Sequence, residues 1–327
     1  MKLITYSVRV LAAALAAGLS LIAPSFAQTY PSKPLHIVVP HPAGIGVDVE
    51  ARLLASLMSI ELGQPVLVEN RPGFGTLLAM EAVAKAVPDG YTVGIGLPSN
   101  LASNPRLFDR PTFDVERGLT PVSLMWSLPW SLYVNSSVPA KSLAELVALA
   151  KANPEGLTYA TTGVGTFQHV TTEWLMSLTG GKLRHVPYGT SPWTSDVLTG
   201  RVDVVMWTLA GMTDYVKAGK IRMLALSNGQ RRSEQLPDVP TFAEAGLENY
   251  DVTAWAGLVV PAGTPLPIVE KLAAAAAKAV NSASFGEHVA RGGGTIVASS
   301  PAEFDAHLKA ERARWKKVIA DAGIRLE

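Results

Sequence analysis

Two glycine-containing segments carry the residue types that could bind an anion. The first, residues 40–48, reads PHPAGIGVD and lies between an apolar run and a helical pattern. It should join the carboxyl end of a strand to the start of a helix, where ligands bind in open α/β sheets. Helix N-termini offer unpaired N–H groups and a positive dipole end, and glycine lets the backbone approach a ligand. The candidate contacts here are His41, Gly44, Ile45, Gly46 and Asp48.

The second segment, residues 161–169, reads TTGVGTFQH and repeats this layout. Thr166 can cap the following helix or offer its hydroxyl to a ligand. Either segment alone is more simply an ordinary strand–helix turn, with Asp48 as a helix cap and His169 as a structural residue. Two such loops facing each other would instead form a carboxylate clamp that needs no Lys or Arg. The candidate contacts of this second loop are Thr161, Gly165, Thr166 and His169.

Motifs for most enzymatic chemistry are absent. The chain has no cysteine, which excludes thiolate nucleophiles and thiolate metal sites. Residues 44–49 lack the third glycine of a dinucleotide fingerprint, and neither a phosphate-binding Gly-Lys-Ser/Thr loop nor a Gly-x-Ser-x-Gly elbow occurs. We therefore expect no catalytic residue, no metal and no cofactor. A hydrolase using Ser99, His169 or Asp196 is the alternative, but no motif places these residues together.

The first 27 residues have the order of a secretory signal peptide. Lys2 and Arg9 precede an apolar run over residues 10–21, and small residues stand at Ser25 and Ala27. The run is shorter than the roughly 20 residues that span a bilayer, so cleavage after Ala27 is favoured over a retained membrane anchor. We predict a periplasmic protein. Without this segment the chain has 26 basic and 27 acidic residues, a net charge of −1, which indicates no nucleic-acid partner.

Apolar periodicity predicts alternating strands and helices. Residues 35–39, 66–68 and 91–96 have the pattern of buried strands, and the helix after the first strand places Val49, Leu53, Leu54 and Leu57 on one face. This alternation predicts an α/β fold with a parallel sheet covered on both faces. It resumes with strands at 157–160, 202–207 and 221–226 and helices at 142–152, 167–179, 267–282 and 301–322.

Two further apolar stretches, residues 122–134 and 252–260, have the character of crossings between two lobes. The chain would leave the first lobe, build a second and return. The predicted organisation is a signal peptide over 1–27, a discontinuous first lobe of 28–128 plus 254–327, and a continuous second lobe of 129–253. About 300 residues are enough for two such lobes without disulfides.

Short motifs along the chain after residue 28 resemble those of one family. They are Tyr30-Pro31-Ser32-Lys33-Pro34, Pro40-His41-Pro42-Ala43-Gly44 with Asp48 and Arg52, Glu69-Asn70-Arg71-Pro72-Gly73, Pro88-Asp89-Gly90-Tyr91-Thr92, His185-Val186-Pro187-Tyr188, Leu236-Pro237-Asp238-Val239-Pro240-Thr241 and Pro261-Ala262-Gly263-Thr264-Pro265. The chain resembles the periplasmic solute receptors of tripartite tricarboxylate transporters, often called Bug proteins.

This resemblance implies a type II periplasmic-binding-protein fold, with two α/β lobes joined by two crossing segments and a ligand cleft between them. It also implies that the two glycine loops clamp a carboxylate of a small organic acid, partly through ordered waters. The expected role is a monomeric, non-catalytic receptor that delivers its ligand to the membrane permease subunits of a tripartite transporter. A sensor that presents ligand to a signalling protein is the alternative.

The sequence departs from the family pattern at the expected ligand contacts. His41 replaces the usual Phe, and Ile45, Val164, Phe167 and Trp207 stand where relatives often have small or polar residues. An apolar lining cannot satisfy a second carboxylate, but it can bury a ring or a short chain. We therefore expect an apolar or aromatic monocarboxylate rather than a dicarboxylate. The simpler interpretation is that these side chains pack in the lobe cores.

Overall fold

The computed structural model describes residues 30–44, 46–104, 113–153, 156–189, 191–227 and 232–324. The chain from Lys33 onward is one compact unit, and the fold below is that of this unit. The predicted signal peptide over 1–27 and the candidate contact Ile45 lie outside the described residues. Within those residues, no helix combines the length and the apolar character needed to cross a membrane.

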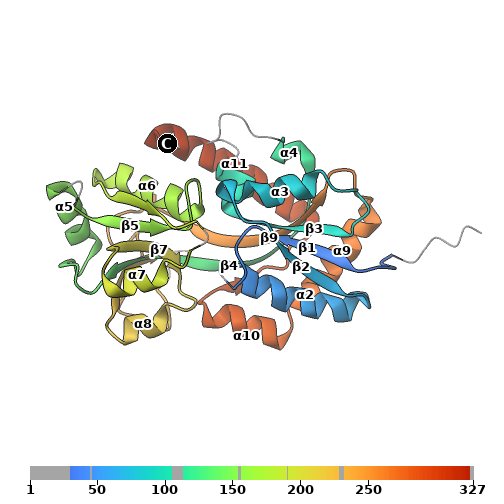
Figure 1. The fold of residues 1–327 in the computed structure, drawn as a ribbon, viewed down its shortest axis with the longest axis horizontal. Coiled ribbons are helices and arrows are strands. Elements are labelled where there is room, and N and C mark those ends of the chain that lie inside the picture. The colour runs from blue at the N-terminus through green and yellow to red at the C-terminus, as the bar shows by residue number, and fades with distance from the viewer. Residues whose placement is uncertain are drawn as a thin grey trace, which may run out of the picture. The chain divides into compact units, whose positions relative to one another are not determined.

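The first lobe is built on three parallel strands. Strand β1 (Leu35–Val39) lies between β2 (Val66–Asn70) and β3 (Thr92–Gly96). Helix α2 (Asp48–Leu62) connects β1 to β2, and α3 (Leu77–Ala84) connects β2 to β3 (Figure 1). Parallel strands need such crossover connections, so the alternation of strands and helices in the sequence correctly predicted that these three strands are parallel.

The buried face of α2 differs from the predicted one. Its buried apolar residues include Ala51, Leu54, Ala55 and Met58, whereas Val49 is 45% exposed. The helix is therefore rotated relative to the face expected from Val49 and the leucines. Small alanines allow α2 to pack closely on the sheet and on α9 (Leu266–Val280).

The second lobe repeats the parallel arrangement. Strand β5 (Thr158–Thr161) lies between β6 (Arg184–Pro187) and β7 (Val204–Thr208), and α6 (Phe167–Thr179) follows β5. Helix α5 (Leu143–Ala152) and strand β8 (Ile221–Ser227) have close to their predicted bounds. The short helices α7 (Thr194–Thr199) and α8 (Thr213–Lys217), and strand β6, were not predicted.

Two long strands join the lobes, as the two predicted crossings required. Residues 119–129 of β4 (Leu119–Asn135) pair with β9 (Thr253–Pro261), while residues 130–135 pair with β7 and β8. Strand β9 also pairs with β3, so the sheet runs in the order β2-β1-β3-β9-β4-β7-β5-β6 (Figure 1). The sheet is mixed rather than parallel as predicted, because β4 and β9 run antiparallel to their neighbours. The two-lobed fold is thereby confirmed, and the residue bounds 28–128, 254–327 and 129–253 stay a prediction.

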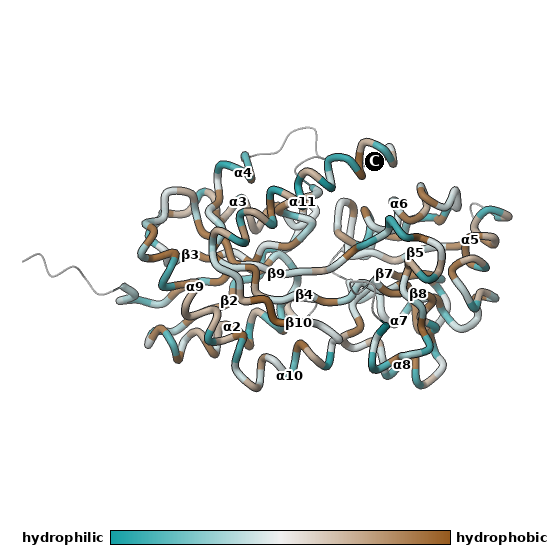
Figure 2. Tube along the Cα trace, turned by 180° about the vertical axis from the view of Figure 1, so that it is seen from behind, coloured by the Kyte–Doolittle hydropathy of each residue, from teal (hydrophilic) through white to brown (hydrophobic). Residues whose placement is uncertain are grey.

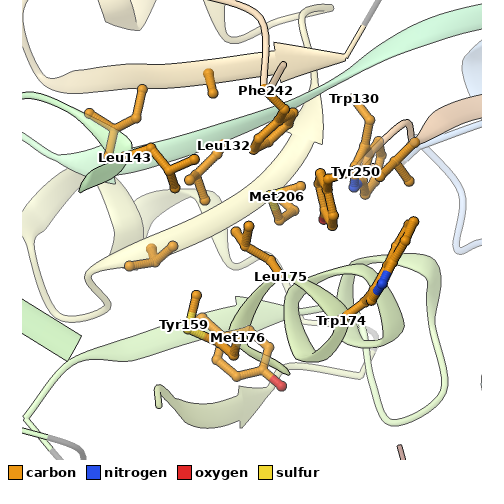
Figure 3. Packing of buried hydrophobic residues seen from close by; sticks show 14 of the residues in the cluster. Trp130, Leu132, Leu143, Tyr159, Trp174, Leu175, Met176, Met206, Phe242 and Tyr250 are labelled. Carbon is orange, nitrogen blue, oxygen red and sulfur yellow. The ribbon is translucent and has the colours of Figure 1, made fainter. Parts of the chain in front are cut away.

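The core of the second lobe lies between its strands and α6. Leu132 and Met206 on the strands face Leu175 of α6, and Tyr250 packs against Trp174 with ring centroids 4.8 Å apart (Figure 3). Each fully buried aliphatic side chain of this kind contributes roughly 1.5–3 kcal/mol to folding. This packing fixes the direction of α6, and so the position of its first turn.

The C-terminal helix α11 (Pro301–Ala322) contacts both lobes. It starts with a capping box between Ser300 and Glu303. Its Phe304 packs beside Trp255 of β9, while its Trp315 packs against Phe167 of α6 with ring centroids 5.7 Å apart. Trp315 of α11 thus packs against the first turn of α6. Figure 2 shows hydrophilic residues on the outer helices, α4 (Val115–Gly118) and α11 among them.

Candidate ligand-binding site

A cavity of about 470 Å³ lies between the two lobes. Its walls come from the start of α2 and the short π-helix η2 (Ser99–Ser103) in the first lobe, and from the start of α6 and the end of β7 in the second. Strands β4 and β9 and helix α10 (Ala283–Arg291) complete it. The volume is that of a small-molecule site. The cavity therefore lies where the fold predicted a ligand cleft.

Tryptophan side chains form a large part of the apolar lining. Of the seven tryptophans in the chain, five line this cavity, namely Trp126, Trp130, Trp193, Trp207 and Trp255. Trp207 packs between Trp130, 6.1 Å away, and Trp193, 5.1 Å away, measured between ring centroids. Such a wall buries an apolar body at about 25 cal/mol per Å² of area. No Lys or Arg is among the described residues that line the cavity.

The two glycine loops meet beside this cavity. A second, smaller cavity of about 320 Å³ has both loops in its wall, and Val164 lines it. His41, Thr162 and Thr166 line both cavities. The two segments singled out by their shared layout therefore lie next to each other in space, although they start at residues 40 and 161 of the chain.

Asp48 closes the first loop from inside. Its carboxylate accepts hydrogen bonds from Gly44 N at 2.7 Å, Arg52 Nε at 2.8 Å and Asn70 Nδ2 at 2.6 Å, and it is fully buried. Burial alone would raise its pKa, but the hydrogen bonds from Arg52, Gly44 and Asn70 hold the pKa of Asp48 below its usual value. Asp48 is the first residue of α2, and Val47 occupies the cap position. The expectation of a helix cap was wrong, because this side chain turns back to the loop.

His41 holds the same loop through its ring. Its Nδ1 accepts a hydrogen bond from Val47 N at 3.3 Å. A Cβ on Gly46 would lie 2.4 Å from that Nδ1, so only glycine leaves room for the ring. Burial lowers the pKa of His41 to about 4, although the Asp48 carboxylate opposes this. The ring is therefore neutral at pH 7, as an Nδ1 acceptor must be.

His169 holds the second loop in the same way. Its Nδ1 accepts from Gly165 N at 3.1 Å, and its ring stacks on His185 with centroids 4.3 Å apart. Burial lowers the pKa of both rings to about 4. The Thr161 hydroxyl lies 2.6 Å from His185 Nε2 and also bonds to the loop backbone at Gly163.

Thr166 faces both cavities, but its hydroxyl bonds within the loop. Thr166 Oγ1 donates to the Gly163 carbonyl oxygen at 2.7 Å. Thr166 occupies the N-cap position of α6, although its side chain makes no capping hydrogen bond. The first N–H groups of a helix have no intrahelical partner, so this helix start is a place for an acceptor.

Gln168 offers a donor at the same place. Its Oε1 accepts hydrogen bonds from Thr162 N at 2.9 Å and from Thr162 Oγ1 at 2.7 Å, and the backbone N–H can only donate. This fixes the amide orientation and leaves Nε2 as a donor. Nε2 is buried and has no partner among the described residues, and Gln168 lines the large cavity. A ligand oxygen would satisfy it.

Glu50 is an acid in the opposite wall. It lies in the first turn of α2, is only 8% exposed and lines the large cavity. Its Oε1 lies 3.3 Å from His288 Nε2 of α10. Its Oε2 is buried and has no partner among the described residues. The two helix starts that face the cavity therefore carry opposite kinds of unpaired group.

The predicted contacts separate into two layers. Those that line the large cavity are His41, Gly44, Gly46, Thr166 and Trp207. Those that lie behind it and hold the loops are Asp48, Thr161, Gly165 and His169. The lining also includes residues not predicted, namely Glu50, Ser99, Trp126, Trp130, Gln168, Trp193, Trp255 and His288. Of these, Gln168 lies inside the second segment, and Ser99 had been singled out only for the hydrolase alternative.

The residues of the hydrolase alternative have separate partners. Ser99 Oγ lies 2.9 Å from Thr76 Oγ1, His169 Nδ1 accepts from Gly165 N, and Asp196 pairs with Tyr188 and Arg201. Each is thus engaged in a different local structure. In a hydrolase, the nucleophile must instead hydrogen-bond to the base, and the base to the acid that orients it.

The chain is similar to a family of transporter receptors and to solved periplasmic binding proteins. The sequence matches the tripartite tricarboxylate transporter family receptor over residues 50–324. Protein BugT of Bordetella pertussis is 33% identical over 307 residues, covering 93% of this chain and 94% of BugT. The structure of the periplasmic binding protein BugD has a TM-score of 0.85 at 29% identity and covers 91% of this chain and 100% of its own.

Two similar solved structures contain carboxylates. MatC from Rhodopseudomonas palustris, with bound malate, has a TM-score of 0.83 at 30% identity, covering 89% of this chain and all of MatC. R. palustris Rpa4515 with adipate has a TM-score of 0.84 at 34% identity, covering 90% of this chain and 99% of its own. Family match, sequence relatives and fold agree. The chain belongs to the tripartite tricarboxylate transporter receptor family and has the two-lobed fold of its periplasmic binding proteins.

Proposed function

We propose that this chain captures a small organic acid in the cavity between its lobes and delivers it to the membrane subunits of a tripartite transporter. The observation that carries the proposal is the buried, unpaired donor Gln168 Nε2 at the start of α6, inside a cavity of suitable size. A helix start with no acidic residue in its first turn favours an anion. The malate and adipate of two similar structures support a carboxylate.

The ligand is an apolar or aromatic monocarboxylate. The tryptophan lining can bury a ring, and Phe167 and Trp207 both line the cavity while they pack on other rings. A second carboxylate on the ligand would have no cationic partner from Lys or Arg in the described lining. The buried carboxylate of Glu50 in the first-lobe wall would also repel it, and an unpaired buried charge costs several kcal/mol.

Binding involves no catalysis, and the protein works in the periplasm after cleavage following Ala27. The separate engagement of Ser99, His169 and Asp196 supports a binding role. Intact-mass measurement of exported protein should give a chain that begins at Gln28. A protein that kept Met1 in the membrane fraction would contradict this. Presentation of ligand to a signalling protein remains the second candidate role.

A ligand screen tests the proposed function. Native mass spectrometry of freshly purified protein would identify a retained acid by its mass. A thermal-shift series would then compare benzoate- and nicotinate-like acids with succinate, malate and citrate. We expect stabilisation by the aromatic monocarboxylates. Stabilisation by the di- and tricarboxylates alone would overturn the ligand class, and stabilisation by no carboxylate would overturn the function.

A further inference from the structure

Glu50 is an acidic side chain that the capture of a carboxylate does not explain. It lines the same cavity as the Gln168 donor but comes from the other lobe. An acid in an anion site repels the ligand unless it binds a different part of it. The position of Glu50 therefore carries information about the rest of the ligand.

The hydrogen-bonding state of Glu50 is incomplete. Oε1 is 3.3 Å from His288 Nε2, whereas Oε2 is buried without a partner among the described residues. Buried carboxylate oxygens are unfavourable when unpaired, and the helix start of α2 offsets this only in part. The described lining holds no Lys or Arg that could pair with it. A donor group on the ligand would supply the missing hydrogen bond.

We propose that the ligand carries a hydrogen-bond donor, a hydroxyl or an amino group, at the end of its apolar body away from the carboxylate. This inference rests on the proposed function. The carboxylate accepts from Gln168 Nε2 in the second lobe, and the donor group bonds to Glu50 Oε2 in the first. The tryptophans bury the body between them. A ligand bound in this way joins the two lobes through one hydrogen bond at each end.

A purely structural role for Glu50 makes a different prediction. In that case Glu50 would only hold α2 to α10 through His288, and ligand donors would not affect its contribution. Substituting Glu50 would then lower stability and leave the discrimination between ligands unchanged. The ratio of two dissociation constants separates these roles, because loss of stability affects both ligands alike.

The experiment is calorimetry with a matched ligand series on the full mature protein. The series is benzoate, the meta and para hydroxybenzoates and aminobenzoates, and the aminomethylbenzoates, with benzylamine as a donor without carboxylate. The hydroxyl and aromatic amino compounds supply neutral donors, and the aminomethyl compounds a cationic one. Proteins compared are the wild type, Glu50→Gln and Glu61→Gln. Glu61 is a control on the same helix that pairs with Lys278 outside the cavity.

We expect at least one donor-bearing acid to bind wild type ten- to a hundredfold more tightly than benzoate, the usual effect of a hydrogen bond to a charged group. The gain should fall below threefold in Glu50→Gln and persist in Glu61→Gln. No gain in wild type, or an equal gain in Glu50→Gln, overturns the inference while benzoate binding still supports the proposed function. If no acid binds, the proposed function fails and the inference that rests on it fails with it, whether or not benzylamine binds.

Discussion

The two glycine loops have the same construction and opposite electrostatics. In each loop a neutral histidine accepts a backbone N–H through Nδ1, from Val47 to His41 in the first and from Gly165 to His169 in the second. The helix that follows the first loop has two acids in its first turn, and the helix that follows the second has none. Equal loop geometry therefore does not mean equal ligand chemistry.

The difference decides which loop can hold an anion directly. Asp48 and Glu50 occupy the positive end of the α2 dipole with the chain's own charges. The first turn of α6 has no acid, so Gln168 Nε2 and the backbone N–H groups are the hydrogen-bond donors at that end of the helix. The resemblance implies that both loops clamp one carboxylate, whereas the two acids at the start of α2 favour a carboxylate held at the start of α6.

Acidification should have the largest effect on the stability of the protein. It tests the feature that the two loops share, a neutral histidine that accepts a backbone N–H. The pKa of His41, His169 and His185 is about 4 in the folded protein, against about 6.5 in an unfolded chain. The unfolded state therefore binds more protons between these values, so stability falls as the pH drops from 6.5 towards 4. His41 and His169 should each cost roughly 2 kcal/mol between pH 7 and pH 5, and the more exposed His185 should cost less because solvent screens it.

Denaturant unfolding at pH 7, 6 and 5 would measure this loss. Substitution of His41, in the first loop, by Asn should reduce the slope of the unfolding free energy against pH by about 1 kcal/mol per pH unit. The corresponding substitution of His169 should have at least that effect, because His185 stacks on it. A stability that does not change between pH 7 and pH 5 would show that the rings are not neutral acceptors.

Exchange of the donor in the second loop should have the next largest effect. Gln168→Glu keeps the acceptor for Thr162 but replaces the unpaired donor by a carboxylate oxygen. Affinity for the best acid of the screen should fall at least a hundredfold, about 3 kcal/mol, because a hydrogen bond to a charged group is lost and a like charge is added. Calorimetry with Gln64→Glu as control would measure it.

Unchanged affinity in Gln168→Glu would break the comparison. The control residue Gln64 lies after α2 and does not line the cavity, so its substitution should leave binding as it is. A loss in both variants would indicate a general effect of added negative charge. A loss confined to Gln168→Glu would locate the carboxylate at the start of α6.

The regular elements of the fold could be predicted, and the short ones could not. The helices 167–179 and 301–322 and the strand 35–39 have their predicted bounds, because the helices have a periodic apolar pattern over several turns and the strand is a run of buried apolar residues. Strand β6 pairs with β5 alone at the sheet edge and has no buried residue, so it lacks an apolar run. Helix α8 has five residues, too few for a periodic pattern.

The site could be predicted where one segment forms it and not where distant segments do. Both loops were found because a strand, glycines and a helix start follow one another in the sequence. Glu50 has the pattern of a solvent-facing residue beside Val49, yet it is buried and pairs with His288, 238 residues away. The tryptophan wall likewise comes from β4, β7, β9 and the segment before α7. Only the tertiary fold brings these together.

The buried acid of the first loop gives a smaller, local prediction. Asp48→Asn should lower the free energy of unfolding by about 2 kcal/mol, because the hydrogen bonds that Gly44 N and Arg52 Nε donate to this buried side chain lose a charged acceptor. Asp321→Asn is the control, since this acid is largely exposed and pairs with Lys317 on the surface. Thermal and urea unfolding would compare them. Equal stability of both variants would show that Asp48 does not hold the loop.

The smallest effect should come from the threonine that faces both cavities. Thr166→Ala removes a hydroxyl that donates to the Gly163 carbonyl oxygen at 2.7 Å. The loop should therefore lose an internal hydrogen bond, while the ligand loses no direct hydrogen bond. Affinity should fall less than tenfold, about 1 kcal/mol, with Thr213→Ala outside the loops as control. A hundredfold loss would mean that the hydroxyl turns from Gly163 to the ligand. The carboxylate would then have two side-chain donors in the second loop, and the asymmetry between the loops would be larger than the present hydrogen bonds indicate.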